Sequence, residues 1–217
     1  MEIKYLGHAA FLIKSKNARL LTDPFDPQMV EIKLSKIEAD IVTISHHHQD
    51  HDFMAAISGE PLVIDLPGDY EKRGFRIFGY PSYHDKVQGK ERGKNTLFKI
   101  ETEGIRILHC GDLGYVPDEK FLDSLGEIDI LLVPVGGYYT IDAKEAVTLA
   151  KKIEPAIIIP MHYKTAKHHP QIFEKIAPLD DFLKEINQSI EPQDKLVIRK
   201  EDLVEMEMRA ITLNINN

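Results

Sequence analysis

The feature that most constrains this chain is a strand-like run that ends directly in a cluster of histidines. The run ADIVTIS, residues 39–45, is rich in β-branched residues and has the length of a buried strand. It leads into HHHQDHD, residues 46–52, with four histidines and two aspartates. Composition alone would place about a third of a histidine in such a window. The junction therefore predicts a ligand-rich loop at the end of a strand.

The spacing within the cluster divides its side chains into pairs. Because side chains alternate along a strand, His46 and His48 are expected on one side and His47 on the other. Asp50 and His51 follow where the chain turns, and Asp50 is suited to cap a short helix after it. Imidazole and carboxylate groups together suit a cation such as zinc. A solvated histidine-rich turn is the competing interpretation, but it leaves the junction with the strand unexplained.

Apolar runs of strand length recur along the chain and predict a fold rich in sheet. They lie at residues 2–6, 10–14, 18–23, 61–65, 75–80, 95–101, 105–110, 128–134 and 156–160. Helical spacing predicts one helix after an N-cap at Asp142 and a second through residues 172–186, which Pro178 must bend or divide. A series of strands followed by alternating strands and helices favours a mixed α/β or α+β layer structure.

Composition and charge bound the class of protein. A chain of 217 residues fits a single domain spanning residues 1–217. With Cys110 as the one cysteine, no internal disulfide can form, and a cytoplasmic location is expected. The N-terminus does not resemble a signal peptide, and no apolar run approaches bilayer length, so no membrane partner is expected. The net charge of −8 disfavours a broad nucleic-acid-binding surface.

Three further residues, in loops or just after strands, complete a candidate ligand set. His84 lies in the loop PSYHDK, and Asp112 and His162 each follow an apolar strand, in ILHCGDLG and AIIIPMHYKT. Loops on a rigid scaffold are where a sheet presents functional side chains. A lone histidine there would usually be structural or exposed, but the cluster at 46–52 favours a shared site.

These residues resemble the motifs of the metallo-β-lactamase superfamily. Its motif HxHxDH corresponds here to His46, His48, Asp50 and His51, followed in order by a separate histidine, an aspartate after a glycine and a late histidine after a strand. The chain is also similar to the small stand-alone branch that includes ascorbate-6-phosphate-lactonase-like proteins and N-acylphosphatidylethanolamine phospholipase-like hydrolases. That similarity rests on YLGHAAFLI, LLTDPF, KNTLFKIE, ILHCGDLG, LLVPVGGYYTIDAKEA and IIPMHYKT.

The resemblance implies a fold, a ligand set and a cofactor. The implied fold is α/β (α+β), a four-layer αββα sandwich with the metals at one edge of the two sheets. Zinc is the implied metal, two ions per chain, with iron or manganese as alternatives. The implied ligands are His46, His48 and His84 for one ion, Asp50, His51 and His162 for the other, and Asp112 as the bridge.

Other histidines and acidic residues are candidates for supporting roles. Metal-bound histidines need an acceptor for their other ring nitrogen, and Asp23 in LLTDPF is the candidate. His8 either faces the site or is a hydrogen-bonded turn residue. Four residues are expected outside the site: His109 and Cys110 as structural residues, and His168 and His169 as exposed ones.

Such a ligand set points to hydrolysis. Two dications about 3.5 to 4 Å apart can share a water whose pKa zinc lowers to roughly 7, so a metal-bridging hydroxide becomes the nucleophile. Asp50 and Asp112 are the catalytic candidates, and Asp50 could also orient the nucleophile or pass a proton to the leaving group. The two carboxylates leave the centre cationic, which favours a small anionic ester, lactone or phosphodiester.

Basic residues follow two of the candidate ligands and could bind a phosphate or carboxylate. They are Lys86, Lys90, Arg92 and Lys94 after His84, and Lys164 and Lys167 after His162. Because Asp85 and Glu91 are interleaved with the first group, a solvated basic loop is equally well supported.

Other functions remain open at this point. The same fold and ligands can hold iron for redox chemistry, although the sequence shows no flavin-binding domain. A non-catalytic metal-binding protein would require a site without an open coordination position. A large nucleic-acid substrate is disfavoured because no substrate-gripping module is evident. The sequence leaves the oligomeric state undetermined.

Overall fold

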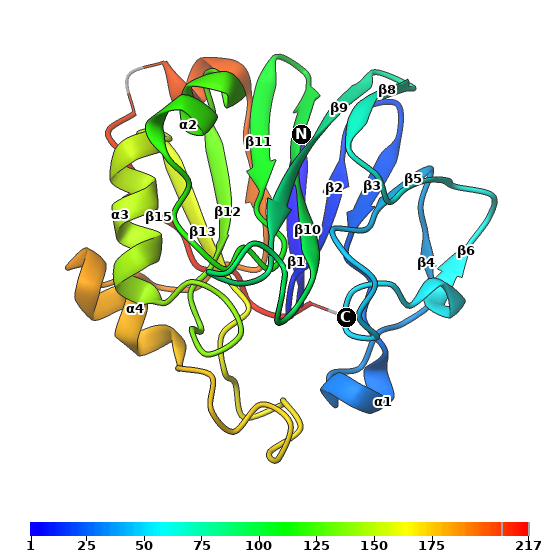
Figure 1. The fold of residues 1–217 in the computed structure, drawn as a ribbon. Coiled ribbons are helices and arrows are strands. Elements are labelled where there is room, and N and C mark those ends of the chain that lie inside the picture. The colour runs from blue at the N-terminus through cyan, green and yellow to red at the C-terminus, as the bar shows by residue number, and fades with distance from the viewer. Residues whose placement is uncertain (205, 217) are drawn as a thin grey trace.

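Two β-sheets packed face to face form the centre of the computed structural model (Figure 1), which describes residues 1–204 and 206–216. The six-stranded sheet has the order β14 (Leu196–Val197), β1 (Glu2–Gly7), β2 (Ala10–Lys14), β3 (Arg19–Thr22), β5 (Ile41–Thr43) and β7 (Leu62–Ile64). The seven-stranded sheet has the order β15 (Arg209–Ala210), β13 (Ile157–Met161), β12 (Ile130–Pro134), β11 (Ile105–His109), β10 (Lys94–Thr102), β9 (Phe75–Tyr83) and β8 (Gly68–Lys72). Each apolar run singled out in the sequence forms one of these strands.

Strand direction decides which loops come together. In the first sheet, β1 and β3 both run antiparallel to β2, and β5 runs parallel to β3, so these three strands share a direction. In the second sheet, β9 and β11 both run antiparallel to β10, and β12 and β13 run parallel to β11. The segments that follow the co-directional strands of each sheet therefore lie at one edge of it.

Apolar side chains of both sheets make the main core. Ile107, Ile130 and Ile157 are neighbours in register on the parallel strands and are fully buried. Tyr5 and Phe11 pair across the β1–β2 hairpin with ring centroids 4.9 Å apart. Burial of this apolar surface from water is the dominant stabilising term for such a sandwich.

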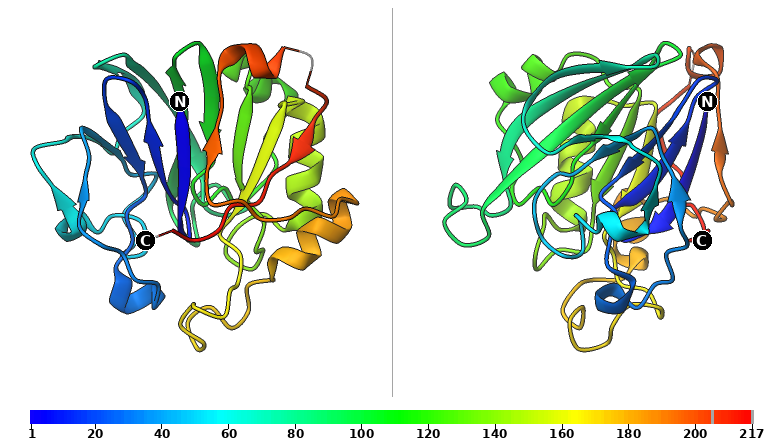
Figure 2. Two further views of the ribbon diagram at one scale, coloured as in Figure 1. Left: turned by 180° about the vertical axis from the view of Figure 1, so that it is seen from behind. Right: turned by 90° about the vertical axis from the view of Figure 1, so that its right-hand side faces the viewer.

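Helices and short elements cover the outer faces of the sheets (Figure 1 and Figure 2). The seven-stranded sheet is covered by α2 (Glu119–Leu125), α3 (Ala143–Ile153) and α4 (Leu179–Ile186). The other side carries α1 (Pro27–Val30), the 3-10 turn Met54–Ala56, β4 (Ile37–Glu38) and β6 (Ile57–Ser58). This arrangement confirms the predicted four layers, although short elements largely replace helix in the fourth. Among residues 1–204 and 206–216, none of the helices has the length and hydrophobicity of a membrane-spanning segment.

The two predicted helices have different outcomes. The helix after Asp142 is present as α3, and Asp142 and Glu145 form a reciprocal capping box at its start. The helix predicted through residues 172–186 is wrong in its first half, because α4 begins only at Leu179, after Pro178. Proline disfavours helical backbone at the residue before it, and Phe173 is buried against the first sheet instead.

The expectation that Asp50 caps a helix is also wrong. The following 3-10 turn has Phe53 at its N-cap position and no side-chain cap. The carboxylate of Asp50 instead lies 3.1 Å from Nε2 of His8. A histidine from another strand end thus replaces the local backbone as the contact of this side chain.

Candidate metal centre

Histidine and aspartate side chains converge where the co-directional strands end. From the first sheet come His8 after β1, Asp23 after β3 and residues 45–51 after β5; from the second come His84 after β9, Asp112 after β11 and His162 after β13. His8, Asp23 and His162 have left-handed backbone conformations, with φ of 55°, 37° and 52°. Residues other than glycine rarely adopt this conformation, and such strain concentrates at functional sites.

Three histidines form one group of ligand atoms. His46, His48 and His84 each offer a ring nitrogen, and these atoms lie within 4.8 Å of one another. Nε2 of His46 is 3.0 Å from Nδ1 of His48. His46 and His84 are buried, whereas His48 is exposed. The side chain of His47 lies outside this group and is 62% exposed.

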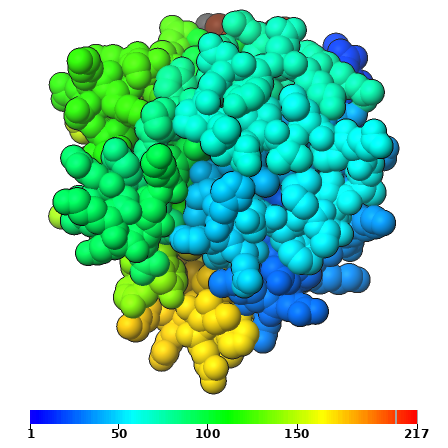
Figure 3. All heavy atoms as spheres, turned by 45° about the vertical axis from the view of Figure 1, so that its right-hand side comes forward, coloured from blue at the N-terminus to red at the C-terminus, as the bar shows by residue number. Residues whose placement is uncertain are grey.

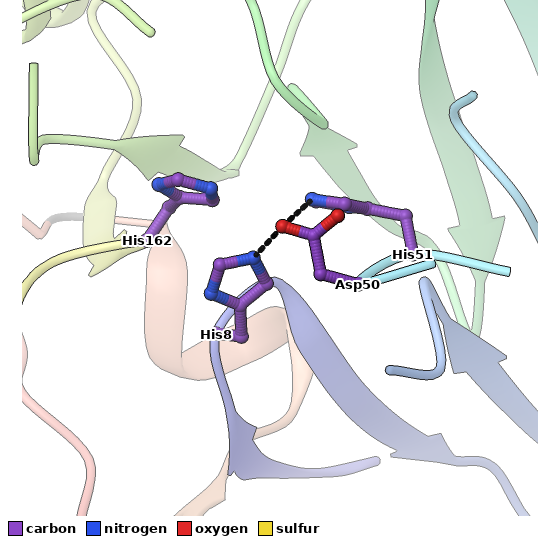
Figure 4. A group of neighbouring side chains, drawn as sticks. All are labelled: His8, Asp50, His51 and His162. Carbon is purple, nitrogen blue, oxygen red and sulfur yellow. Dashed lines mark hydrogen bonds and ion pairs between the residues drawn. The ribbon is translucent and has the colours of Figure 1, made fainter. Parts of the chain in front are cut away.

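Asp50, His51 and His162 form a second group together with His8 (Figure 4). Oδ2 of Asp50 is 3.1 Å from Nε2 of His8 and 3.8 Å from Nε2 of His51. The ring of His8 lies 4.1 Å from the ring of His162, measured between centroids. His8 lies in a turn, as one interpretation of the sequence expects, and its ring also faces the candidate ligands, as the other expects.

Asp112 contacts members of both groups. Its Oδ2 is 3.1 Å from Nε2 of His84 and 3.3 Å from Nε2 of His162, and its Oδ1 is 3.3 Å from Nε2 of His51. The preceding Gly111 permits this approach, because a Cβ at that position would lie 2.5 Å from Cβ of Ser45. The side chain is 2% exposed, so its contacts are shielded from water.

Asp23 organises the hydrogen bonds behind two of the histidines. Its carboxylate accepts from the Ser45 amide at 2.8 Å, the Ser45 hydroxyl at 2.6 Å and Nδ1 of His51 at 2.9 Å. Because the Ser45 hydroxyl donates to Asp23, its oxygen accepts from Nδ1 of His46 at 2.9 Å. In both His46 and His51, Nδ1 carries the proton and donates a hydrogen bond, so the lone pair of Nε2 is available to bind a metal ion. The sequence singles out Asp23 for such a role but not Ser45, whose place directly before the first histidine was the available signal.

Unsatisfied atoms at the centre match a cation. Nε2 of His51 and Oδ1 of Asp112 face each other at 3.3 Å, and neither has a hydrogen-bond partner among the residues that the structure describes. Since Nδ1 of His51 donates to Asp23, Nε2 either carries the second proton of a cationic ring or, in the neutral ring, is an acceptor that faces a second acceptor, the carboxylate of Asp112. Imidazole nitrogen and carboxylate oxygen form a donor set that zinc and related ions bind. The residues present thus fit a metal centre.

The pKa shifts of His51 and Asp112 also favour a positive charge, a proton or a metal ion, between these two side chains. Burial lowers the pKa of His51, but the carboxylates of Asp112 and Asp50 outweigh it and raise that pKa well above its usual value. Burial would raise the pKa of Asp112, but His162, His51 and His84 hold it well below its usual range. Asp112 is therefore ionised at neutral pH, and either a proton or a metal ion can balance its charge.

His168 is buried, so the expectation that it is exposed is wrong. Its ring packs against Phe173, with centroids 5.1 Å apart, and lies 5.7 Å from the ring of His8. Nδ1 of His168 accepts a hydrogen bond from the Thr165 amide at 3.1 Å. The expectation of exposure rested on the distance of His168 from His162 along the chain, but the segment packs inwards with buried Phe173.

The remaining histidines and the cysteine lie outside the two groups. His109 and Cys110 are buried, and Nε2 of His109 donates to the carbonyl oxygen of Ala9 at 2.9 Å. His169 is partly exposed, with its Nε2 3.7 Å from a carboxylate oxygen of Glu31. These residues contribute to packing or to the surface.

A pocket of about 250 Å³ opens onto the centre. Its lining residues are Met29, His48, Gln49, Asp50, His84, Arg92, Asp112, Tyr139, His162, Ile172 and Phe173. They come from separate segments between residues 29 and 173. Figure 3 shows blue, green and yellow parts of the chain meeting on one face. The apolar residues and Tyr139 carry no sequence pattern that would have identified them as lining.

Comparison with known proteins gives matches along most of the chain. Residues 2–162 match a family model described as a beta-lactamase superfamily domain. A UPF0173 metal-dependent hydrolase of Carboxydothermus hydrogenoformans is 31% identical over 194 residues, which cover 76% of this chain and 85% of that protein. A UPF0173 metal-dependent hydrolase of Pyrococcus abyssi is 31% identical over 208 residues, which cover 82% of this chain and 92% of that protein.

Solved structures show the same similarity in three dimensions. A structure from Thermotoga maritima, described as a candidate zinc-dependent hydrolase of the metallo-beta-lactamase superfamily, has a TM-score of 0.79 and 38% identity and covers 98% of this chain and 99% of its own. A metallo hydrolase from Ignicoccus hospitalis has a TM-score of 0.64 at 21% identity, covering 97% and 94%. The second likeness is one of fold.

Proposed function

The chain belongs to the metallo-β-lactamase superfamily and is a metal-dependent hydrolase, and from this premise we propose that it is a dinuclear zinc enzyme that cleaves a small anionic ester, lactone or phosphodiester. The observation that carries the proposal is the position of Asp112. Its carboxylate contacts His84 of one group and both His51 and His162 of the other. A carboxylate shared in this way suits two neighbouring ions.

Each residue of the site has a role in this proposal. His46, His48 and His84 would hold one ion, Asp50, His51 and His162 the other, and Asp112 both. When bound, such a pair of ions supplies a water of lowered pKa and polarises the substrate's carbonyl or phosphoryl oxygen. His8 donates from Nε2 to Oδ2 of Asp50, which keeps that carboxylate ionised and places it at the pocket, where it would orient the nucleophile.

The pocket and its charge support a small anionic substrate. A volume of about 250 Å³ is small beside the roughly 300–1,000 Å³ of sites for drug-sized ligands. Two divalent ions would carry four positive charges, and the carboxylates of Asp50 and Asp112 carry two negative charges. The centre would therefore remain cationic. An anionic ester, lactone or phosphodiester is the substrate class that this charge favours.

Removal of the metal is the experiment that tests this function. We expect chelation to lower hydrolysis of a panel of lactones, phosphodiesters and phosphorylated sugars at least about 100-fold, and about two equivalents of zinc to restore it. Mass spectrometry of the native protein measures the metal content in parallel. Hydrolysis that survives complete chelation would contradict the proposal, and oxygen consumption restored by iron alone would favour redox chemistry.

A further inference from the structure

The segment 85–94, directly after His84, is held in one shape by a single buried carboxylate. Asp85 accepts hydrogen bonds from four backbone amides, those of Val87 at 2.8 Å, Gly89 at 2.8 Å, Glu91 at 3.0 Å and Arg92 at 2.9 Å. These four hydrogen bonds fix the backbone of Arg92 relative to His84.

The side chain of Arg92 extends from this segment to the pocket. Its guanidinium carbon lies 4.4 Å from the ring centroid of Tyr139 and 5.9 Å from that of Tyr138. Tyr139 is itself fixed, because its hydroxyl donates to the carbonyl oxygen of Ile172 at 3.0 Å. A guanidinium whose face stacks on a ring keeps its edge N–H donors available for a carboxylate or phosphate.

Arg92 differs from the other basic residues near the site in having no anionic partner. Within residues 1–204 and 206–216, its side chain contacts the two tyrosine rings and makes no ion pair. Lys86, by contrast, pairs with Glu145, and Lys164 donates to the carbonyl oxygen of Glu174. Three more lysines are exposed and do not line the pocket at Asp50, Asp112 and His162: Lys90, Lys94 and Lys167. Lys94 lines a neighbouring pocket of about 630 Å³ together with His46, His48 and Arg92. Arg92 is the one arginine or lysine among the residues that line the pocket at Asp50, Asp112 and His162.

We propose that Arg92 binds a carboxylate or phosphate group of the substrate other than the group that is cleaved. The inference rests on the proposed function and deepens it, because it narrows the substrate to a small molecule with a second anionic group. The metal centre would attract any anionic group at the bond that is cleaved. A guanidinium in a fixed position would instead select substrates whose second anionic group lies within its reach. Met29, Ile172 and Phe173 give the same pocket an apolar lining.

A matched set of substrates tests this proposal on the zinc-loaded protein. The set is one aryl ester in three forms, bearing a free carboxylate, a phosphate or a neutral primary amide at the same position. We expect Arg92→Gln to lower kcat/KM about 10- to 100-fold for at least one anionic form, mainly through KM, and to leave the amide within about twofold. The kcat/KM of Arg92→Lys for the anionic forms should fall between those of the wild-type protein and Arg92→Gln. Lysine keeps the positive charge but lacks the paired N–H donors of the guanidinium.

Lys90→Gln is the control, because it removes the same charge from an exposed position of the same segment. It should leave all three substrates within about twofold of the wild-type protein. Losses in Arg92→Gln that are equal for the anionic and neutral forms, or absent for both anionic forms, would overturn the proposal. The form that loses more distinguishes a carboxylate from a phosphate.

A binding measurement separates this inference from the proposed function. If the wild-type protein hydrolyses none of these esters or the wider panel, the proposed function fails, and calorimetric titration with the carboxylate and phosphate forms then decides the role of Arg92. Binding at least about tenfold weaker in Arg92→Gln than in Lys90→Gln, at equal zinc content, would support it. Equal affinities would overturn it.

Discussion

Alanine in place of Asp112 is expected to lower kcat at least about 10³-fold and to release at least one of the bound metal ions. The reason is that its two carboxylate oxygens contact His84, His162 and His51, so the change removes a ligand from both groups. Kinetics with zinc in excess measure the first effect. Metal analysis after dialysis measures the second.

Asp52→Ala is the matched control for this change. Asp52 ends the same histidine cluster, but its carboxylate lies 3.3 Å from Nδ1 of exposed His47 and is 31% exposed itself. We expect this variant to keep its metal and its kcat within about twofold, because exposed ion pairs contribute little. If Asp112→Ala behaved like this control, Asp112 would have no place in the metal centre.

Asparagine in place of Asp23 is expected to weaken metal binding about 10- to 100-fold without removing a ligand. Asp23 is fully buried and accepts three hydrogen bonds, from Ser45 and His51. An amide NH₂ in its place would face one of these donors, so the free energy of unfolding should also fall by about 1–3 kcal/mol. Competition with a chromophoric chelator measures the affinity, and denaturant unfolding of the metal-free protein measures the stability.

Asp26→Asn provides the comparison for Asp23→Asn. Asp26 lies three positions later and accepts a hydrogen bond from the Gln28 amide at 2.8 Å, at the start of α1. The change should leave metal affinity within about twofold, because an asparagine caps a helix nearly as well as an aspartate. Equal affinities in the two variants would mean that Asp23 does not orient the histidines.

The strands and the convergence of the ligands could be predicted because the sequence encodes them locally. β-branched runs predicted the strands, and the placement of ligands after strands or in loops predicted a shared site. The structure adds that the ends of co-directional strands bring these ligands together. His46 and His48 were predicted to share a side from the period of two, and the structure places their ring nitrogens 3.0 Å apart.

Features that depend on contacts between distant segments could not be predicted. The burial of His168 follows from the packing of Phe173 and from the ring of His8, which lies 5.7 Å away across the fold. The contact between Asp50 and His8 joins positions 42 residues apart and replaced the expected helix cap. Among six basic residues near the ligands, only the three-dimensional arrangement sets Arg92 apart, because it alone lines the pocket.

Anomalous X-ray scattering at the zinc edge, from crystals of the zinc-loaded protein, tests the central claim most directly. We expect two peaks, one within about 2.0–2.2 Å of ligand atoms of His46, His48 and His84 and the other within that distance of Asp50, His51 and His162, with Asp112 in contact with both. A single peak, or two peaks that do not share Asp112, would contradict a dinuclear centre built from these residues.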